Sequence, residues 1–230
     1  NNPIIQLTLS DKDFDYLDSN KKEFVKTVLP IIINENQNIL MIRSFVNELK
    51  GKLETFRTLN NNEIRKLNDI AKKYNIKYQN KHKLDLVDEI LSNVDVIPNS
   101  IVLAQAAIES GWGKSRFAKE YNALFGEYTY DDSEGVIPLE RENGDTHLIK
   151  AFSSYSNSVE SYFDNINSHY AYEDFRDIRN IMRKRNNFSN VNLLVNKLST
   201  YAEDENYIKT IRQVIKTNNF GIFDQKTISY

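Results

Sequence analysis

The sequence predicts a mainly helical protein that carries one β-hairpin. Only seven glycines and four prolines occur among 230 residues, so few positions interrupt a helix. Apolar residues recur at helical spacing along most of the chain. The exception is Gly135–Phe152, where Asn143-Gly144, the preferred centre of a type I′ turn, separates two β-prone runs.

Composition excludes several classes of function. Hydrophobic residues make up 40% of the chain and charged residues 27%, which is typical of a folded globular protein. The formal net charge of −2 does not indicate the basic surface that nucleic-acid binding needs. No segment approaches the roughly 20 apolar residues that a membrane helix needs. Because cysteine is absent, disulfides, thiolate catalysis and cysteine-bound metals are excluded.

Three helices are expected in the first part of the chain, and we assign no chemistry to them. The first begins with Pro30 in its first turn, runs to about Leu49 and can end at Gly51. The second covers Asn62 to Tyr74 and the third Leu84 to Asn93. They are expected to form a supporting layer.

The second part of the chain begins with a helix over Ile101–Ser110. Asn99 or Ser100 can cap its start, and Gly111 is a plausible left-handed terminator. An irregular stretch through Asp132 follows a short helix, and the hairpin comes next. Asn157 and Glu160 have capping-box spacing at the next helix. The remaining helices are expected at 114–121, 157–168, 172–184, 191–199 and 204–216.

Glu109 is the strongest candidate for a catalytic residue. It lies in the last turn of its helix, where the macrodipole disfavours a negative charge, and Trp112 and neighbouring alanines would desolvate it. Both effects raise the pKa of a carboxyl group, as a general acid for glycoside cleavage requires. Gly111 and Gly113 leave room for a bulky ligand. On this chemistry alone, a solvated structural carboxylate is the more common alternative.

The segment around Glu109 resembles a known signature. Ala104–Ser115, with the sequence Ala-Gln-Ala-Ala-Ile-Glu-Ser-Gly-Trp-Gly-Lys-Ser, is similar to peptidoglycan-cleaving β-N-acetylglucosaminidases of glycoside hydrolase family 73, chiefly the Bax-type branch. The flagellar peptidoglycan hydrolases are more distant. The resemblance continues through Asn122–Gly126, the hairpin, Asn165–Arg176 and Tyr201–Ile215, and covers roughly 21–224. One departure is Tyr170, where the family more often has proline.

The resemblance implies a lysozyme-like helical fold with the hairpin beside the active-site cleft. It implies one glucosaminidase domain over residues 1–230, with 1–95 as the supporting layer and 96–220 as the catalytic core. Glu109 would be the essential acid and Tyr201 an active-site residue. A hairpin glutamate would be the second carboxylate, Glu140 first and Glu142 second. Substrate-assisted attack by the N-acetyl group would remove the need for either.

Hairpin register supports the choice of Glu140. If Asn143 and Gly144 are the central turn residues, Glu140 faces His147, which could orient it. Glu140 and Glu142 then share an acidic face, which suits a polysaccharide cleft. Solvated edge charges are the common alternative for such carboxylates.

Glu142 is also a candidate for substrate binding, and four further residues are candidates with a packing or capping role as the alternative. They are Trp112, Asn122, Phe125 and Tyr128. The three histidines are too dispersed in the sequence for a metal site. We therefore expect no cofactor and no metal.

The leading interpretation is a bacterial enzyme that hydrolyses the β-1,4 bond after N-acetylglucosamine in peptidoglycan glycan strands. A muramidase or lytic transglycosylase is an alternative, and so are a wall-binding module without turnover and a helical interaction domain. We expect a monomer in the periplasm or cell envelope. The start at Asn1-Asn2-Pro3 suggests a processed or trimmed product, with a signal or anchor upstream.

Overall fold

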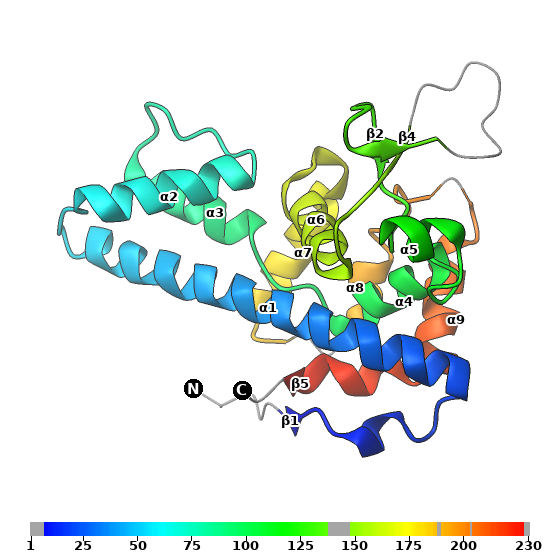
Figure 1. Cartoon of the computed structure of the whole chain (residues 1–230). Helices are drawn as coiled ribbons and strands as arrows, with labels where there is room; N and C mark the ends of the chain where they lie inside the picture. Colours follow the sequence, from blue (N-terminus) through cyan, green and yellow to red (C-terminus); the bar gives the residue numbers. More distant parts are fainter. Residues whose placement is uncertain (1–6, 138–147, 188–189, 203, 228–230) are drawn as a thin grey trace. The chain divides into compact units, whose positions relative to one another are not determined.

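The computed structural model describes residues 7–137, 148–187, 190–202 and 204–227 (Figure 1). The described part is mainly helical, which confirms the expected fold class. The chain forms two compact units. Unit 1 consists of Asn1–Glu35, Pro98–Tyr162 and Lys209–Tyr230, and unit 2 of Asn36–Ile97 and Phe163–Ile208. One joint at 97/98 lies close to the boundary expected near residue 95, but the two units interleave along the sequence.

The long helix α1 spans Ser19–Glu54, so Pro30 lies in its interior. The prediction that the helix begins at Pro30 is wrong, as is the prediction that Gly51 ends it. An interior proline removes a backbone hydrogen bond and costs about 3 kcal/mol. Burial of each neighbouring apolar side chain contributes about 1.5–3 kcal/mol and offsets that cost. The buried neighbours are Phe24, Val25, Val28, Leu29, Ile32 and Ile33.

The other predicted helices exist, with ends that differ by a few residues. They are α2 (Asn61–Lys73), α3 (Lys83–Asn93), α4 (Asn99–Glu109), α5 (Arg116–Tyr121), α6 (Tyr155–Ser168), α7 (Glu173–Lys184), α8 (Val191–Val195) and α9 (Tyr207–Thr217). The expected capping box of Asn157 with Glu160 is wrong. Ser154 Oγ accepts from the backbone N–H of Asn157, and α6 begins at Tyr155, two residues earlier than expected.

A three-stranded antiparallel sheet in unit 1 extends the expected hairpin. Its strands are β2 (Tyr128–Thr129), β3 (Gly135–Val136) and β4 (Leu148–Lys150), with β4 in the middle. β2 was not predicted, because a two-residue strand is too short to show an alternating pattern. β2 instead falls in the stretch that was expected to be irregular.

The pairing of β3 with β4 corrects the expected register. Val136 pairs with Ile149, whereas a two-residue Asn143-Gly144 turn would place Pro138 opposite Ile149. Loop length and bulges set a hairpin register together with the turn residues, and the sequence does not fix them. The shift of two residues preserves the alternation of faces. Residues 138–147, with Glu140, Glu142 and His147, lie outside the described residues.

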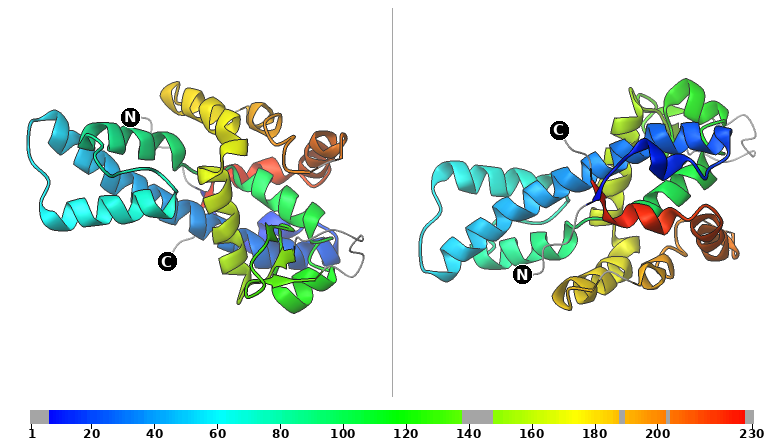
Figure 2. Two further views of the ribbon diagram at one scale, coloured as in Figure 1. Left: turned by 90° about the horizontal axis from the view of Figure 1, so that it is seen from above. Right: turned by 90° about the horizontal axis from the view of Figure 1, so that it is seen from below.

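The two ends of the described chain meet in unit 1 and lie close to α4. β1 (Leu7–Thr8) pairs in parallel with β5 (Lys226–Thr227). The 3₁₀ helix η3 (Phe220–Gln225) packs against α4 (Figure 2). A shorter 3₁₀ helix, η1 (Asp11–Phe14), places Phe14 against Phe223 of η3, with ring centroids 5.9 Å apart. The N-terminal and C-terminal segments thereby support the helix that ends in Glu109.

Unit 2 is held together by a buried charged cluster around Asp95. Asp95 is fully buried, and Arg183 donates to both of its carboxylate oxygens. The Nε atom of Arg43 lies 3.3 Å from Asp95 Oδ1. Arg179, also fully buried, donates to the carbonyls of Asn93 at 2.7 Å and Asp95 at 2.9 Å. Side chains of α1 and α7 therefore fix the connection between α3 and α4.

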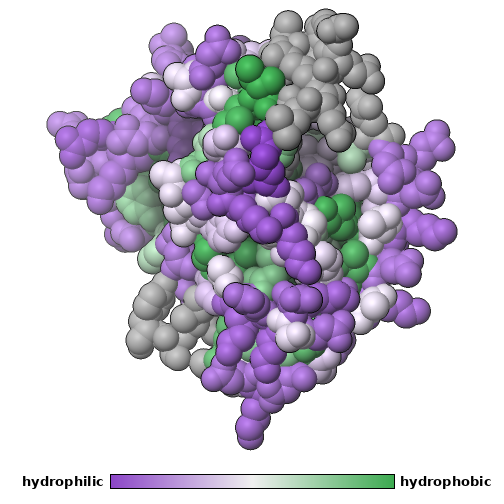
Figure 3. Space-filling view, turned by 45° about the vertical axis from the view of Figure 1, so that its right-hand side comes forward, coloured by the Kyte–Doolittle hydropathy of each residue, from purple (hydrophilic) through white to green (hydrophobic). Residues whose placement is uncertain are grey.

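The hydropathy of the described residues bears on whether any helix could span a membrane. On the face shown in Figure 3, hydrophilic residues predominate and hydrophobic residues occur in small separate areas. No helix within the described ranges is long and apolar enough to cross a membrane.

Candidate active site

Helix α4 is the buried support of the site. Every residue from Asn99 to Ala107 is buried, and Glu109 at the end is half-buried. The start of the helix is capped by Asp224, which accepts from the Ser100 backbone N–H at 2.7 Å and from Ser100 Oγ at 2.8 Å. The expected capping by Asn99 or Ser100 is therefore wrong, because Asn99 donates to the carbonyl of Phe223 instead. Burial raises the pKa of Asp224 to about 6, although the Ser100 hydrogen bonds act to lower it.

The end of α4 turns sharply at Gly111, as predicted. Gly111 has φ +56°, its N–H donates to the Ile108 carbonyl, and the Trp112 N–H donates to the Ala107 carbonyl. This pair of bonds is a Schellman motif, which a left-handed glycine favours. Glu109 is therefore the last helical residue, near the negative end of the macrodipole.

Gly126 forms a wall of the site. It has φ +62°, and a Cβ atom at this position would lie 3.5 Å from Glu109 Oε2. The Glu109 carboxylate thus lies against a backbone that carries no side chain. A left-handed glycine permits this approach, and it leaves open space that any other residue would fill.

Helix α6 holds the segment around Gly126 through three successive contacts. The Leu124 N–H donates to Ser158 Oγ at 3.1 Å. Phe125 stacks on Tyr162 with ring centroids 4.2 Å apart. Ser161 Oγ donates to Glu127 Oε2 at 2.9 Å. The position of Gly126 is therefore set by contacts on both sides of it.

The same part of α6 is tied to α4. Tyr162 is fully buried, and its hydroxyl donates to Gln105 Oε1 at 2.5 Å. Gln105 precedes Glu109 by four residues, so the two side chains lie on one face of α4. Tyr162 therefore links Phe125, next to Gly126, with the helix face that carries Glu109.

The family model for glucosaminidases, described as mannosyl-glycoprotein endo-beta-N-acetylglucosaminidase, matches residues 84–220. This range is more than half of the chain and contains Glu109, Gly126 and Tyr201. The chain belongs to the glucosaminidase family. The expected family resemblance is thereby confirmed.

Relatives of this glucosaminidase-family chain are bacterial. It is 33% identical to protein Bax of Escherichia coli K12 over 184 residues, which cover 79% of this chain and 63% of Bax. It is 35% identical to the peptidoglycan hydrolase FlgJ of the same strain over 92 residues, which cover 36% of this chain and 29% of FlgJ. The chain thus spans less than two thirds of the curated relatives it matches.

A solved structure that is similar to the chain is the catalytic domain of the autolysin Auto from Listeria monocytogenes. The TM-score is 0.43 at 18% identity, and the match covers 84% of this chain and 97% of that one. Membership of the glucosaminidase family rests on the family model.

Tyr201, expected in the active site of the glucosaminidase family, belongs to unit 2. It is half-buried in a row of tyrosine rings. Its ring is parallel to that of Tyr207, with centroids 5.9 Å apart, and lies 6.2 Å from the ring of Tyr172. Tyr172 and Tyr207 are buried, so they support Tyr201 from within unit 2.

Besides Glu142, four residues are expected to bind substrate, and three of them have packing or capping contacts. Phe125 is 1% exposed and belongs to the core in this conformation. The Trp112 ring packs against Phe24 at 5.7 Å and Phe220 at 6.1 Å between centroids. Asn122 ends α5 with φ +53° and donates to the Phe152 carbonyl at 3.0 Å. These contacts match the alternative roles that the sequence left open.

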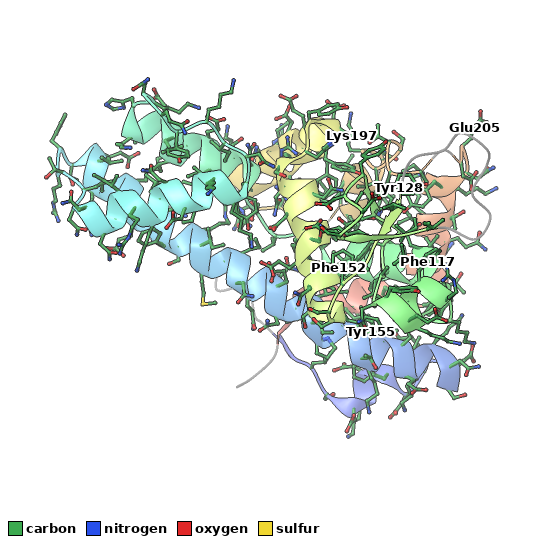
Figure 4. All side chains as sticks on the ribbon, turned by 45° about the horizontal axis from the view of Figure 1, so that its top comes forward. Phe117, Tyr128, Phe152, Tyr155, Lys197 and Glu205 are labelled. Carbon is green, nitrogen blue, oxygen red and sulfur yellow. The ribbon has the colours of Figure 1, made fainter. Side chains whose placement is uncertain are left out.

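Tyr128 is the exposed member of the four, with 65% of its surface accessible. Figure 4 shows it on the sheet, together with Phe117 of α5 and with Phe152 and Tyr155 beyond β4. Phe117, Phe152 and Tyr155 are partly exposed, and the Tyr155 hydroxyl approaches Gly113. These side chains give unit 1 aromatic surface on the elements that follow α4.

Among residues 7–137, 148–187, 190–202 and 204–227, no three histidine or acidic side chains are grouped as a metal site would need. Sequence reasoning gave no role to Gly126, Gln105, Tyr162, Ser161 and Glu127, whose contacts hold the backbone and the helix face around Glu109. Gln105 and Gly126 had usable signals, because both lie in segments of the family resemblance and Gln105 also lies one helical turn before Glu109.

Proposed function

We propose that the chain hydrolyses the β-1,4 bond after N-acetylglucosamine in peptidoglycan glycan strands, with Glu109 as the general acid. The observation that carries the proposal is the place of Glu109, which ends a buried helix with its Oε2 atom beside the bare backbone of Gly126. The family model, described as an endo-beta-N-acetylglucosaminidase, supports the reaction class. The relative FlgJ is a peptidoglycan hydrolase, which supports the proposed substrate.

Glu109 suits proton donation for two physical reasons. The carbonyl ends of α4 disfavour a negative charge on it, so the protonated form that a general acid needs is favoured. The missing side chain at Gly126 allows a sugar ring to approach the carboxyl group. In the reaction, the Glu109 proton passes to the glycosidic oxygen as the bond to the anomeric carbon breaks.

The attack on the anomeric carbon needs a second group. Glu140 is the proposed carboxylate that activates water, with Glu142 as the second choice. Tyr201 is the proposed active-site tyrosine. Its ring contact with Tyr207 supports this role, since a catalytic side chain must be held in place. Attack by the substrate's own N-acetyl group is the route that would make both hairpin glutamates dispensable.

Tyr128 is the proposed sugar contact, because an exposed aromatic ring offers an apolar face and a hydroxyl to a sugar. Trp112, Asn122 and Phe125 then serve the site by holding its backbone. We place the chain's activity outside the cytoplasm, in the periplasm or cell envelope, where peptidoglycan lies. We further propose that the chain acts as a single-domain monomer.

Mass spectrometry of the products from purified peptidoglycan tests the reaction. We expect muropeptides with N-acetylglucosamine at the new reducing end. Products ending in N-acetylmuramic acid would identify a muramidase, and anhydro products a lytic transglycosylase. Binding to the wall without any released product would identify an inactive binding module. The variant Glu109→Gln, incubated in parallel, is the negative control.

A further inference from the structure

Glu127 has an anchored carboxylate and follows Gly126 directly. Its Oε2 atom accepts a hydrogen bond from Ser161 Oγ at 2.9 Å, and this hydroxyl oxygen accepts from Lys150 Nζ at 3.3 Å. The backbone adds a further link, because the Lys150 N–H donates to the Glu127 carbonyl at 2.7 Å. Glu127 is thus fixed between β4 and α6.

The hydrogen bond from Ser161 and the ammonium group of Lys150 favour the charged form of Glu127, and burial of its Oε1 atom acts against them. A hydroxyl that donates to a carboxylate stabilises the negative charge, and an ammonium group behind that hydroxyl adds to the effect. Lys150 Nζ also lies 3.9 Å from Glu134 Oε2, and Glu160, next to Ser161 on α6, is exposed.

Covalent geometry limits the separation of Glu127 from Glu109. Glu109 Oε2 lies 3.5 Å from the position of a Cβ on Gly126, and Glu127 is the next residue. The two carboxyl groups are therefore at most about 12 Å apart, given the fixed Cα–Cα spacing and the reach of a glutamate. At that distance, and at an effective dielectric constant of about 20, a negative charge raises the pKa of a neighbouring carboxyl group by about one unit.

We propose that Glu127 is a positioning residue whose negative charge keeps Glu109 protonated at the pH at which the enzyme works. The inference rests on the proposed role of Glu109 as general acid. An acid is active only while it holds its proton, so activity falls when the pH rises above the pKa of that acid. Repulsion from Glu127 moves this loss of activity to higher pH.

The test is the pH dependence of wall hydrolysis by Glu127→Gln. Glutamine keeps the shape and an oxygen for Ser161 but removes the charge. We expect the alkaline limb of the profile to move down by about one pH unit, while the rate below that limb stays within about threefold of wild type. Ser161→Ala, which removes the hydroxyl donor, should move the limb in the same direction by less. It also serves if Glu127→Gln fails to fold.

Glu134→Gln is the matched control, because Glu134 approaches the same Lys150 but is exposed. The alkaline limb of the Glu134→Gln pH profile should coincide with that of wild type. The inference is overturned if the alkaline limb of Glu127→Gln does not move, or if that variant loses rate equally at every pH. Glu109→Gln separates this failure from failure of the proposed function, since an active Glu109→Gln enzyme would refute the acid itself.

Discussion

Asp95 in unit 2 and Glu109 in unit 1 are both carboxylates beside a helix end, but their surroundings differ. Asp95 is fully buried and paired with arginines. Burial alone would raise its pKa, but the Arg183 hydrogen bond and the charges of Arg179, Arg43 and Arg183 outweigh burial and lower it. Glu109 is half-buried, at the negative end of α4 and against the Gly126 backbone. The first arrangement holds a charge permanently, whereas the second suits a group that exchanges a proton with a ligand.

The largest effect on stability is expected from Asp95→Asn. The substitution leaves buried arginines without their counter-charge, and such a loss costs about 3–5 kcal/mol. Urea unfolding at neutral pH measures the change in the free energy of unfolding. Asp88→Asn is the control, because Asp88 forms a surface pair with Lys50 at 2.7 Å and is half exposed, so about 0–1 kcal/mol is expected. Equal effects of the two substitutions would refute the structural role of Asp95.

A second prediction separates backbone strain from filling of the space beside Glu109. Gly126 and Gly111 have φ +62° and +56°, so alanine strains both by about 1–2 kcal/mol. A new Cβ at Gly126 meets Glu109 Oε2 at 3.5 Å, whereas one at Gly111 meets nothing within 4 Å. We therefore expect Gly126→Ala to lose about tenfold more activity than Gly111→Ala at similar stability. Initial rates on purified walls and thermal unfolding decide this, and equal rates would contradict it.

A smaller effect is expected at the opposite end of α4. The pKa of Asp224 is raised to about 6 from 3.8, so between about pH 4 and pH 6 the folded chain holds a proton that the unfolded chain releases. Stability then falls by at most about 3 kcal/mol as the pH rises through this window, since one pKa unit corresponds to about 1.4 kcal/mol. Asp224→Asn keeps an oxygen for Ser100 and removes the titration. The free energy of unfolding of this variant should change less between pH 4 and pH 6 than that of wild type. The same pH dependence in both proteins would contradict the raised pKa of Asp224.

The sequence predicted the features that depend on local patterns. Helical periodicity located the helices from α2 to α9, and Gly111 identified the turn that ends α4. Pro30 misled the prediction of α1, because burial of its neighbours outweighs a local penalty. The base of the hairpin was predicted in the wrong register, since the turn residues do not determine the loop length.

The contacts that build the site join residues far apart in the sequence, so no local sequence pattern predicts them. Ser100 and Asp224 are 124 residues apart, and Gln105 and Tyr162 are 57 apart. The arginines around Asp95 come from α1 and α7, which lie on either side of it in the sequence. The family signature predicts Glu109 as the acid, but only the fold brings Gly126 against it.

The most direct test of the difference between Glu109 and Asp95 is the rate of wall hydrolysis by Glu109→Gln. The amide keeps the shape and cannot donate the proton. We predict a loss of about 10²–10⁴-fold, with unchanged thermal unfolding and retained binding to walls. Glu120→Gln, an exposed position on α5, should match wild type. A Glu109→Gln rate within roughly threefold of wild type would contradict the assignment of the general acid.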